Sequence, residues 1–140
     1  MRQLTNLILA GVATAALGVA TASADHLNID VSGVKQMGAK VTFKAVKIDK
    51  PGFLVIHATK DGNPVIPQSV GHTWVKPGVT EGVAVTLATA PKDGETFIAM
   101  LHEDTNNNGK YEFGVGSTDV DTPALNAEKK PYVKAFKAGM

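Results

Sequence analysis

The 140-residue sequence contains no cysteine, and its only arginine is Arg2. Without cysteine the chain has no disulfide bond, no thiolate metal site and no cysteine nucleophile. Taking Arg2 from the 14 basic residues leaves 13 lysines against 13 acidic residues, so the rest of the chain has a formal charge of zero. A neutral chain without arginine lacks the basic face of nucleic-acid-binding proteins. We therefore expect no nucleic-acid partner and a fold that rests on its hydrophobic core.

Long apolar runs are also scarce, and the one present lies at the N-terminus. Residues 1–24, MRQLTNLILAGVATAALGVATASA, carry one positive charge, then an apolar stretch, and end in Ala22-Ser23-Ala24. This order predicts a secretory signal peptide that is cleaved after Ala24. No other apolar run is long enough to span a bilayer. We expect a single domain over residues 25–140, periplasmic or secreted, with an unidentified protein or surface partner and no membrane span.

The rest of the sequence shows no convincing helical period. Residues 39–49, AKVTFKAVKID, alternate, whereas GFLVIHA (52–58) and TFIAMLHE (96–103) are apolar throughout, as central strands are. Turn sequences such as KDGNP and APKDGE separate the runs at intervals of about 8–12 residues, which predicts an all-β sandwich or barrel of about seven strands. The expected core is Val41, Phe43, Leu54, Ile56, Val83, Val85, Leu87, Ile98, Met100 and Phe136.

Other segments give weaker signals. Residues 65–75, VIPQSVGHTWV, predict an extended piece that proline and glycine interrupt, and residues 76–82, KPGVTEG, predict a turn or loop. Residues 110–116, KYEFGVG, predict a short strand. The phase of the apolar residues changes after Ala45, which indicates a bulge in that strand.

The segment HEDTNNNGKYEF, residues 102–113, has the ligand spacing of the first half of a calcium loop. Acidic or amide side chains occupy positions 1, 3 and 5, and glycine follows at position 6. Position 12, where an EF-hand has glutamate, is Val115, so another acid must complete the set. The candidate ligands are Asp104, Asn106, Asn108 and the carbonyl of Lys110, with Glu112, Asp119 or Asp121. Because Asn-Gly is also a strong turn former, the first interpretation is a polar turn, and a weak calcium site is the second.

Two histidines end the two apolar strands. If these strands are neighbours, His57 and His102 could lie close together at one end of the sheet, and Met100 shares a face with His102 by alternation. His26 would be the second residue after signal cleavage, where its ring and the free amine can chelate Cu(II). Histidine and methionine without cysteine suit copper better than zinc. The alternative is that both rings form hydrogen bonds with loop backbone and close the strand ends.

From about Ile48 to Phe136 the chain resembles a family of secreted domains named domain of unknown function 7282. The matching pieces are GFLVIHATKDGNPVIPQSV, KPGVTEGVAVTL, FIAMLHEDTNNNGKYEF and DTPAL. The shared pattern is a strand ending in His, a glycine-containing turn, a Val-rich strand, and a His–acid–Asn/Gly loop that closes on an aromatic residue. The resemblance implies an immunoglobulin-like or cupredoxin-like β sandwich, and it implies no reaction.

The sequence lacks the motifs of known catalytic sites: no G-x-S-x-G, no H-E-x-x-H and no phosphate-binding glycine loop occurs. We therefore expect an exported, non-catalytic binding or structural domain that carries a weak calcium loop at residues 104–112 in the second interpretation above. The alternative is a periplasmic copper-binding module that uses His57 and His102. A third hypothesis is a hydrolase that uses the residues of HEDT, 102–105.

Overall fold

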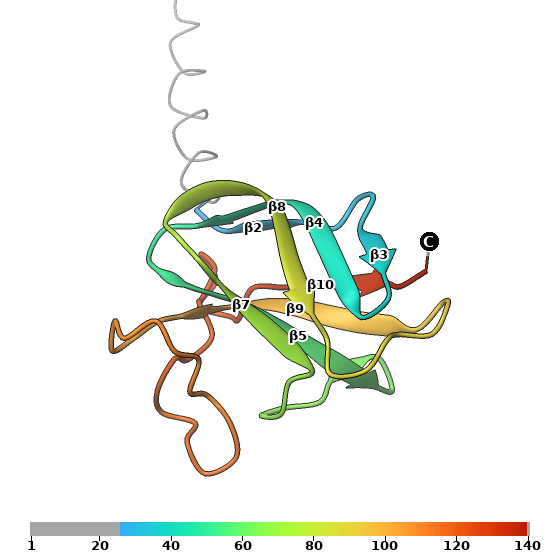
Figure 1. Ribbon diagram of the computed structural model, residues 1–140. Helices are drawn as coiled ribbons and strands as arrows, with labels where there is room; N and C mark the ends of the chain where they lie inside the picture. The colour runs from blue at the N-terminus through green and yellow to red at the C-terminus, as the bar shows by residue number, and fades with distance from the viewer. Residues whose placement is uncertain (1–25, 140) are drawn as a thin grey trace, which may run out of the picture.

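The computed structural model describes residues 26–139, so the expected signal peptide and its cleavage site lie outside the described residues. Residues 26–139 form nine strands in two antiparallel sheets that pack face to face (Figure 1). The strands are β2 (Asn28–Asp30), β3 (Lys35–Met37), β4 (Lys40–Ile48), β5 (Gly52–Lys60), β6 (Asn63–Pro64), β7 (Gly71–Val75), β8 (Gly78–Thr86), β9 (Thr96–Glu103) and β10 (Val133–Lys137). The all-β sandwich is confirmed. The number of strands exceeds the expected seven because short segments such as β3 and β6 also pair.

Each sheet is organised around one long strand. In the five-stranded sheet β5 pairs with β9 along one edge and with β7 and β6 along the other, and β10 follows outside β9. In the four-stranded sheet β4 pairs with β8 along one edge and with β2 and β3 along the other. The two continuously apolar runs, β5 and β9, are therefore interior strands, as their composition predicts.

Alternation along the strands decides which side chains enter the core between the sheets. Leu54 and Ile56 of β5 and Leu101 of β9 lie in this core and are fully buried. Phe43 of β4 contacts Phe136 of β10 across the two sheets, edge to face, with ring centroids 5.1 Å apart.

The expectation for Ile98 and Met100 is confirmed in their burial and is wrong in their position between the sheets. Both side chains are buried, yet neither belongs to the core cluster between the sheets. Side chains of a strand alternate between its two faces, and Leu101 occupies the core face of β9. Ile98 and Met100 therefore lie on the outer face of the five-stranded sheet.

Two segment predictions are also wrong. Residues 76–82 do not form only a loop, because β8 begins at Gly78 and pairs with β4 as far as Ile48. Residues 110–116 form no strand, and their one ladder contact is an isolated bridge between Gly114 and Ser117. The backbone N–H of Glu112 donates to a carboxylate instead of to a neighbouring strand.

The expected bulge after Ala45 is absent from the β4–β8 pair. Phe43 lies opposite Val83 and Ala45 opposite Glu81, so neither strand contains an extra residue. Gly82, between these pairs, has a φ of +65°, a conformation that glycine adopts at little cost. The buried positions of β4 therefore change phase opposite Gly82, while the β4–β8 register stays continuous.

Two connections cover the outer face of the five-stranded sheet. The segment between β9 and β10, residues 104–132, forms the long loop at the lower left of Figure 1. Residues 65–70, between β6 and β7, form the second cover and are tied to β5 by hydrogen bonds from Val65 N to Ala58 O and from Val70 N to Ile56 O. Within the described residues no helix has the length and apolarity needed to cross a bilayer.

Candidate functional site

His57 and His102 meet on the covered outer face of the five-stranded sheet. Both side chains are 0% exposed, and their ring centroids lie 6.0 Å apart. The expectation that the two rings share one end of the sheet is wrong, because β5 and β9 are antiparallel: His57 lies opposite Ile98, and His102 lies opposite Phe53. The rings approach each other by leaning along the face from opposite ends.

One nitrogen of each ring is held by backbone carbonyl groups. Nδ1 of His57 lies 2.7 Å from Gln68 O and 3.1 Å from Val65 O, and Nδ1 of His102 lies 2.7 Å from Asp121 O. A carbonyl oxygen only accepts, so each Nδ1 carries the proton and each Nε2 carries a lone pair. These are the hydrogen bonds of the backbone-closing alternative, and they leave the second nitrogen of each ring free.

Both free nitrogens are buried. Nε2 of His57 and Nε2 of His102 find no hydrogen-bond partner among residues 26–139. A buried polar atom without a partner costs free energy, and in native proteins such atoms are few. Two of them in neighbouring rings therefore mark this place as the strongest candidate for a ligand.

Burial also keeps the two rings neutral. It lowers the pKa of His57, against the opposing effect of the Gln68 and Val65 carbonyls. Burial lowers the pKa of His102 to about 4; the Asp121 carbonyl opposes this shift, and the neighbouring His57 adds to it. At neutral pH both Nε2 atoms are therefore unprotonated and able to bind a cation.

An aromatic group from the long loop covers His102. Tyr111 and Phe113 lie 5.3 Å and 4.9 Å from the His102 ring, both edge to face. The Tyr111 hydroxyl is also buried and has no partner within residues 26–139, and burial, with the charge of Asp121 second, raises its pKa. Tyr111 and Phe113 are not among the predicted site residues, although their place as the aromatic residues that close the loop was an available signal.

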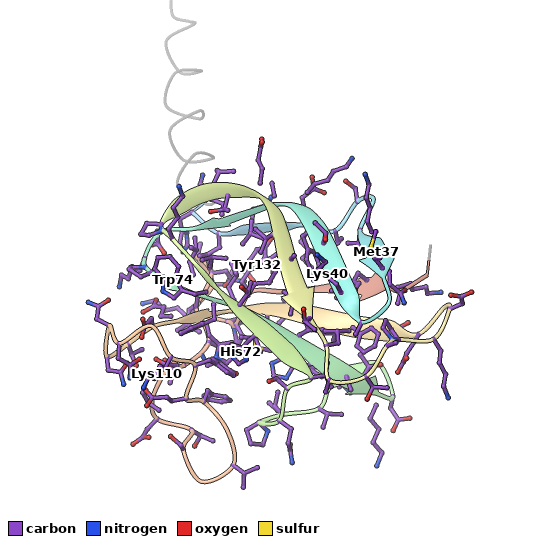
Figure 2. The ribbon with its side chains drawn as sticks, viewed as in Figure 1. Met37, Lys40, His72, Trp74, Lys110 and Tyr132 are labelled. Carbon is purple, nitrogen blue, oxygen red and sulfur yellow. The ribbon has the colours of Figure 1, made fainter. Side chains whose placement is uncertain are left out.

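His72, which the sequence analysis also left out, borders the same face. It lies on β7 opposite Val55 of β5, and its ring is 4.8 Å from that of Tyr111. The side chain is exposed, and Figure 2 shows it beside the long loop that carries Lys110. Burial of part of the ring lowers the pKa of His72.

The two proposed additional copper ligands have different positions. Met100 pairs with Val55 and lies on the outer face between His57 and His102 in the register. His26 lies at the start of the described chain, where its Nε2 is 3.2 Å from the carbonyl oxygen of Leu125. Met100 is therefore the nearer candidate by its place in the sheet.

The candidate calcium loop is joined by its own side chains. The two carboxylate oxygens of Asp104 accept the N–H groups of Asn108 at 3.3 Å and Gly109 at 2.8 Å. The amide groups of Asn106 and Asn108 both donate to Oε1 of Glu112, at 2.7 Å and 2.9 Å. These amide donors, with Lys110 nearby, lower the pKa of Glu112.

Asp121 connects this loop to the histidine pair. Its carboxylate accepts the N–H groups of Thr105 and Glu112 at 3.0 Å and 2.8 Å, and its carbonyl holds His102. The residue is fully buried, with a φ of +49°. The other late acid of the calcium hypothesis, Asp119, is exposed.

Across residues 26–139, no three His, Asp or Glu side chains gather closely enough to hold one metal ion. The candidate calcium ligands Asp104, Asn106, Asn108 and Glu112 instead form hydrogen bonds with one another and with backbone N–H groups. Calcium binding at residues 104–112 stays a prediction.

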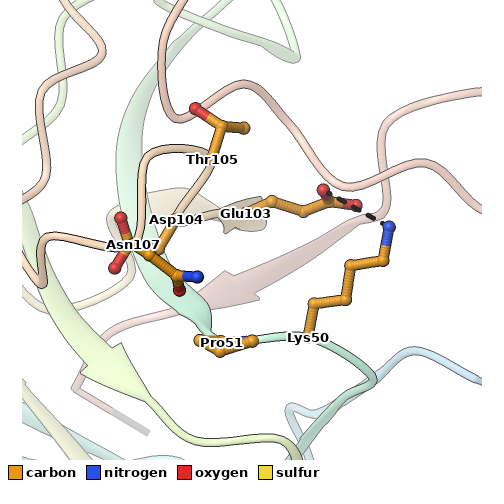
Figure 3. A pocket seen from close by; sticks show the side chains of 6 residues that line it. All are labelled: Lys50, Pro51, Glu103, Asp104, Thr105 and Asn107. Carbon is orange, nitrogen blue, oxygen red and sulfur yellow. Dashed lines mark ion pairs between the residues drawn. The ribbon is translucent and has the colours of Figure 1, made fainter.

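Three of the four residues of the hydrolase hypothesis, Glu103, Asp104 and Thr105, line a pocket at the end of β9, whereas His102 is buried and does not. Lys50, Pro51, Glu103, Asp104, Thr105 and Asn107 form its wall (Figure 3). Glu103 lies 4.0 Å from the ammonium group of Lys50, and the adjacent Asp104 accepts loop N–H groups. Each of these carboxylates is therefore paired with a cation or with backbone.

Sequence comparison finds relatives among surface proteins. The chain is 30% identical over 90 residues to cell surface glycoprotein 1 of Haloarcula hispanica and 28% identical over 90 residues to cell surface glycoprotein 2 of the same organism. Each match covers 64% of this chain and spans only 10% and 9% of the length of the respective glycoprotein. No solved structure matches this chain. The family model described as Domain of unknown function (DUF7282) matches residues 27–138, and the chain belongs to this family.

Proposed function

We propose that this protein is an exported, non-catalytic β-sandwich domain that binds another molecule or supports a surface structure outside the cytoplasm. The observation that carries the proposal is the similarity over 90 residues to about a tenth of two cell surface glycoproteins. A match of that length covers most of one sandwich, so the same unit forms one part of each large surface protein.

The way the sandwich is held together fits this role. An exported domain without disulfides depends on its core and on its loop contacts. The carboxylates of Asp104 and Asp121 stabilise the long loop by accepting its backbone N–H groups. Asp104 and Asp121 therefore have a structural role that accounts for their positions.

Export can be tested at the expected cleavage site. The protein should be found outside the cytoplasm, and mass spectrometry should identify Asp25 as its first residue. A bulky residue in place of Ala24 should block cleavage, whereas Ser23→Phe, at the intervening position, should not. Cytoplasmic protein that retains Met1 would overturn the proposal.

A second candidate function is copper binding by His57 and His102. The observation that favours it is the pair of buried Nε2 atoms without a partner in the described residues. The metal content of protein purified without chelator or affinity tag tests this candidate. Stoichiometric copper supports it, whereas protein that contains no copper and takes up none on titration rejects it.

A further inference from the structure

We propose that His57, His102 and Met100 form a buried site selective for monovalent copper, Cu(I), over Cu(II) and zinc. This inference rests on the second candidate function and specifies its ion and its ligands. The proposal is based on the tautomer of the two rings, the distance between them, their burial, and the position of Met100 between them in the sheet register.

The hydrogen bonds place both rings in the tautomer that a metal requires. Metal-binding histidines commonly donate their second ring N–H to a backbone carbonyl, which fixes the ring and directs the other nitrogen at the ion. His57 does so through Gln68 and Val65, and His102 does so through Asp121. The carbonyl partners come from the two segments that cover the sheet, residues 65–70 and residues 104–132, so the fold orients both rings before any ion arrives.

The separation of the rings suits a single bridging ion. A metal–nitrogen bond of about 2.0 Å, added to roughly 1.1 Å from ring centre to Nε2, allows at most about 6.2 Å between the centres of two rings on one ion. The observed separation is 6.0 Å. At this separation, an ion bound to both Nε2 atoms would have the two nitrogens on nearly opposite sides, in the low-coordinate arrangement that Cu(I) accepts.

The surroundings favour one positive charge over two. Both histidines are fully buried, and Tyr111 and Phe113 cover His102. The Born cost of burying an ion rises with the square of its charge, so a divalent ion costs about four times as much as a monovalent one. Two neutral imidazoles supply no negative charge to offset that cost. A monovalent ion is therefore the better match.

The third donor is soft. Met100 lies on the same face between the two histidines, and thioether sulfur selects Cu(I). Zinc in proteins takes four ligands, most often from Cys, His and carboxylates. Within residues 26–139 no third His, Asp or Glu joins the pair closely enough to ligate with it. Two nitrogens and one thioether therefore suit Cu(I) better than zinc or Cu(II).

The test measures affinity for each ion on the exported protein, without an affinity tag. His26→Ala serves as background, because after signal cleavage at Ala24 the free amine and the His26 ring would offer a separate Cu(II) chelate. Cu(I) is delivered anaerobically against a colorimetric Cu(I) chelator. We expect one Cu(I) per chain, held at least about 100-fold more tightly than Zn(II) or Cu(II). His57→Gln and His102→Gln should each abolish binding, Met100→Leu should weaken it about tenfold, and His72→Gln should leave it unchanged.

A second measurement uses the His26→Ala protein with its site residues intact, so that its result does not depend on whether the His→Gln variants fold. Ag(I), a redox-inert probe of the same charge, should shift the 15N resonances of Nε2 in His57 and His102 and leave those of Nδ1 protonated. Cu(I) binding that survives in His57→Gln, or Ag(I) that leaves both Nε2 signals in place, would overturn the inference. Equal affinity for Cu(II) would remove the selectivity while copper binding stands. Absence of binding for every copper ion would reject both the copper-binding function and the Cu(I) site.

Discussion

The carbonyl oxygen of Asp121 lies 2.7 Å from Nδ1 of His102 and joins the long loop to the sheet. The side chain of the same residue accepts N–H groups from Thr105 and Glu112 at the two ends of the asparagine-rich segment. The histidine pair and the acidic loop, which the sequence presents as two separate candidate sites, are therefore one connected unit. A change in the loop should be felt at the histidine ring.

Asp121→Asn should destabilise the protein, because the amide offers one acceptor oxygen where two N–H groups need one each. Asparagine tolerates the positive φ at this position, so the backbone itself should not be strained. We expect a loss of roughly 1–3 kcal/mol in the free energy of unfolding, measured by urea denaturation. Asp119→Asn, at an exposed position, is the matched control and should stay within about 0.5 kcal/mol of wild type. Equal effects at the two positions would contradict the role given to Asp121.

The stability of the metal-free protein should fall as the pH drops below about 6.5. The folded protein holds the pKa of His102 near 4, whereas the unfolded chain has the ordinary value of 6.5. Between these values the unfolded state binds more protons, so acid favours unfolding; above 6.5 the contribution is complete. A shift of about 2.5 units corresponds to roughly 3 kcal/mol lost by pH 4. The lowered pKa of His57 acts in the same direction.

The His102→Asn variant isolates this contribution, since Asn retains a donor for the Asp121 carbonyl and does not titrate. Its free energy of unfolding, followed by urea denaturation at a series of pH values, should depend less on pH than that of wild type. Met37→Ala, at an exposed side chain that does not titrate, is the control and should parallel wild type. If the His102→Asn and wild-type curves ran parallel from pH 7 to about 4.5, the buried ring would not be the cause.

Much of the fold follows from the period of the apolar residues. The continuous runs of β5 and β9 predicted interior strands, and the alternation of β4 predicted Val41 and Phe43 in the core. Periodicity does not say which face of a continuously apolar strand meets the second sheet. Met100 was therefore placed in the core although it lies on the outer face. The long loop covers that face. Its hydrogen bonds run to side chains and not to a neighbouring strand, so its sequence shows no periodic pattern of apolar residues.

The two histidines of the candidate site could be selected from the sequence, whereas their geometry could not. His57 and His102 could be selected because each ends an apolar run. The closeness of their rings depends on the β5–β9 register and on the two segments that cover the sheet. Carbonyl partners such as Gln68 O belong to the backbone, so no residue type signals them. Tyr111 was missed for a similar reason: its packing on His102 depends on how the loop folds back after residue 104.

The contact between Phe43 and Phe136 should be essential to the packing of the two sheets. Phe43 is fully buried, and its ring meets that of Phe136 edge to face at 5.1 Å. Phe43→Ala should cost about 3–5 kcal/mol in the free energy of unfolding, because it removes buried area and leaves a cavity. Met37→Ala, at a side chain that is 79% exposed, is the control and should cost less than about 0.5 kcal/mol. Calorimetric unfolding of the three proteins measures the difference, and a small loss for Phe43→Ala would contradict the packing described.

The asparagine-rich loop should keep its shape without calcium. Asp104 accepts two backbone N–H groups and Glu112 accepts two side-chain amides, so the loop is cross-linked by its own hydrogen bonds. A ligand that binds only the folded state raises the melting temperature by mass action. We therefore expect a change of less than about 1 °C between excess chelator and about 10 mM calcium, well above the dissociation constants of weak extracellular sites. A rise of several degrees that is lost in Asp104→Asn would instead establish the calcium site at residues 104–112.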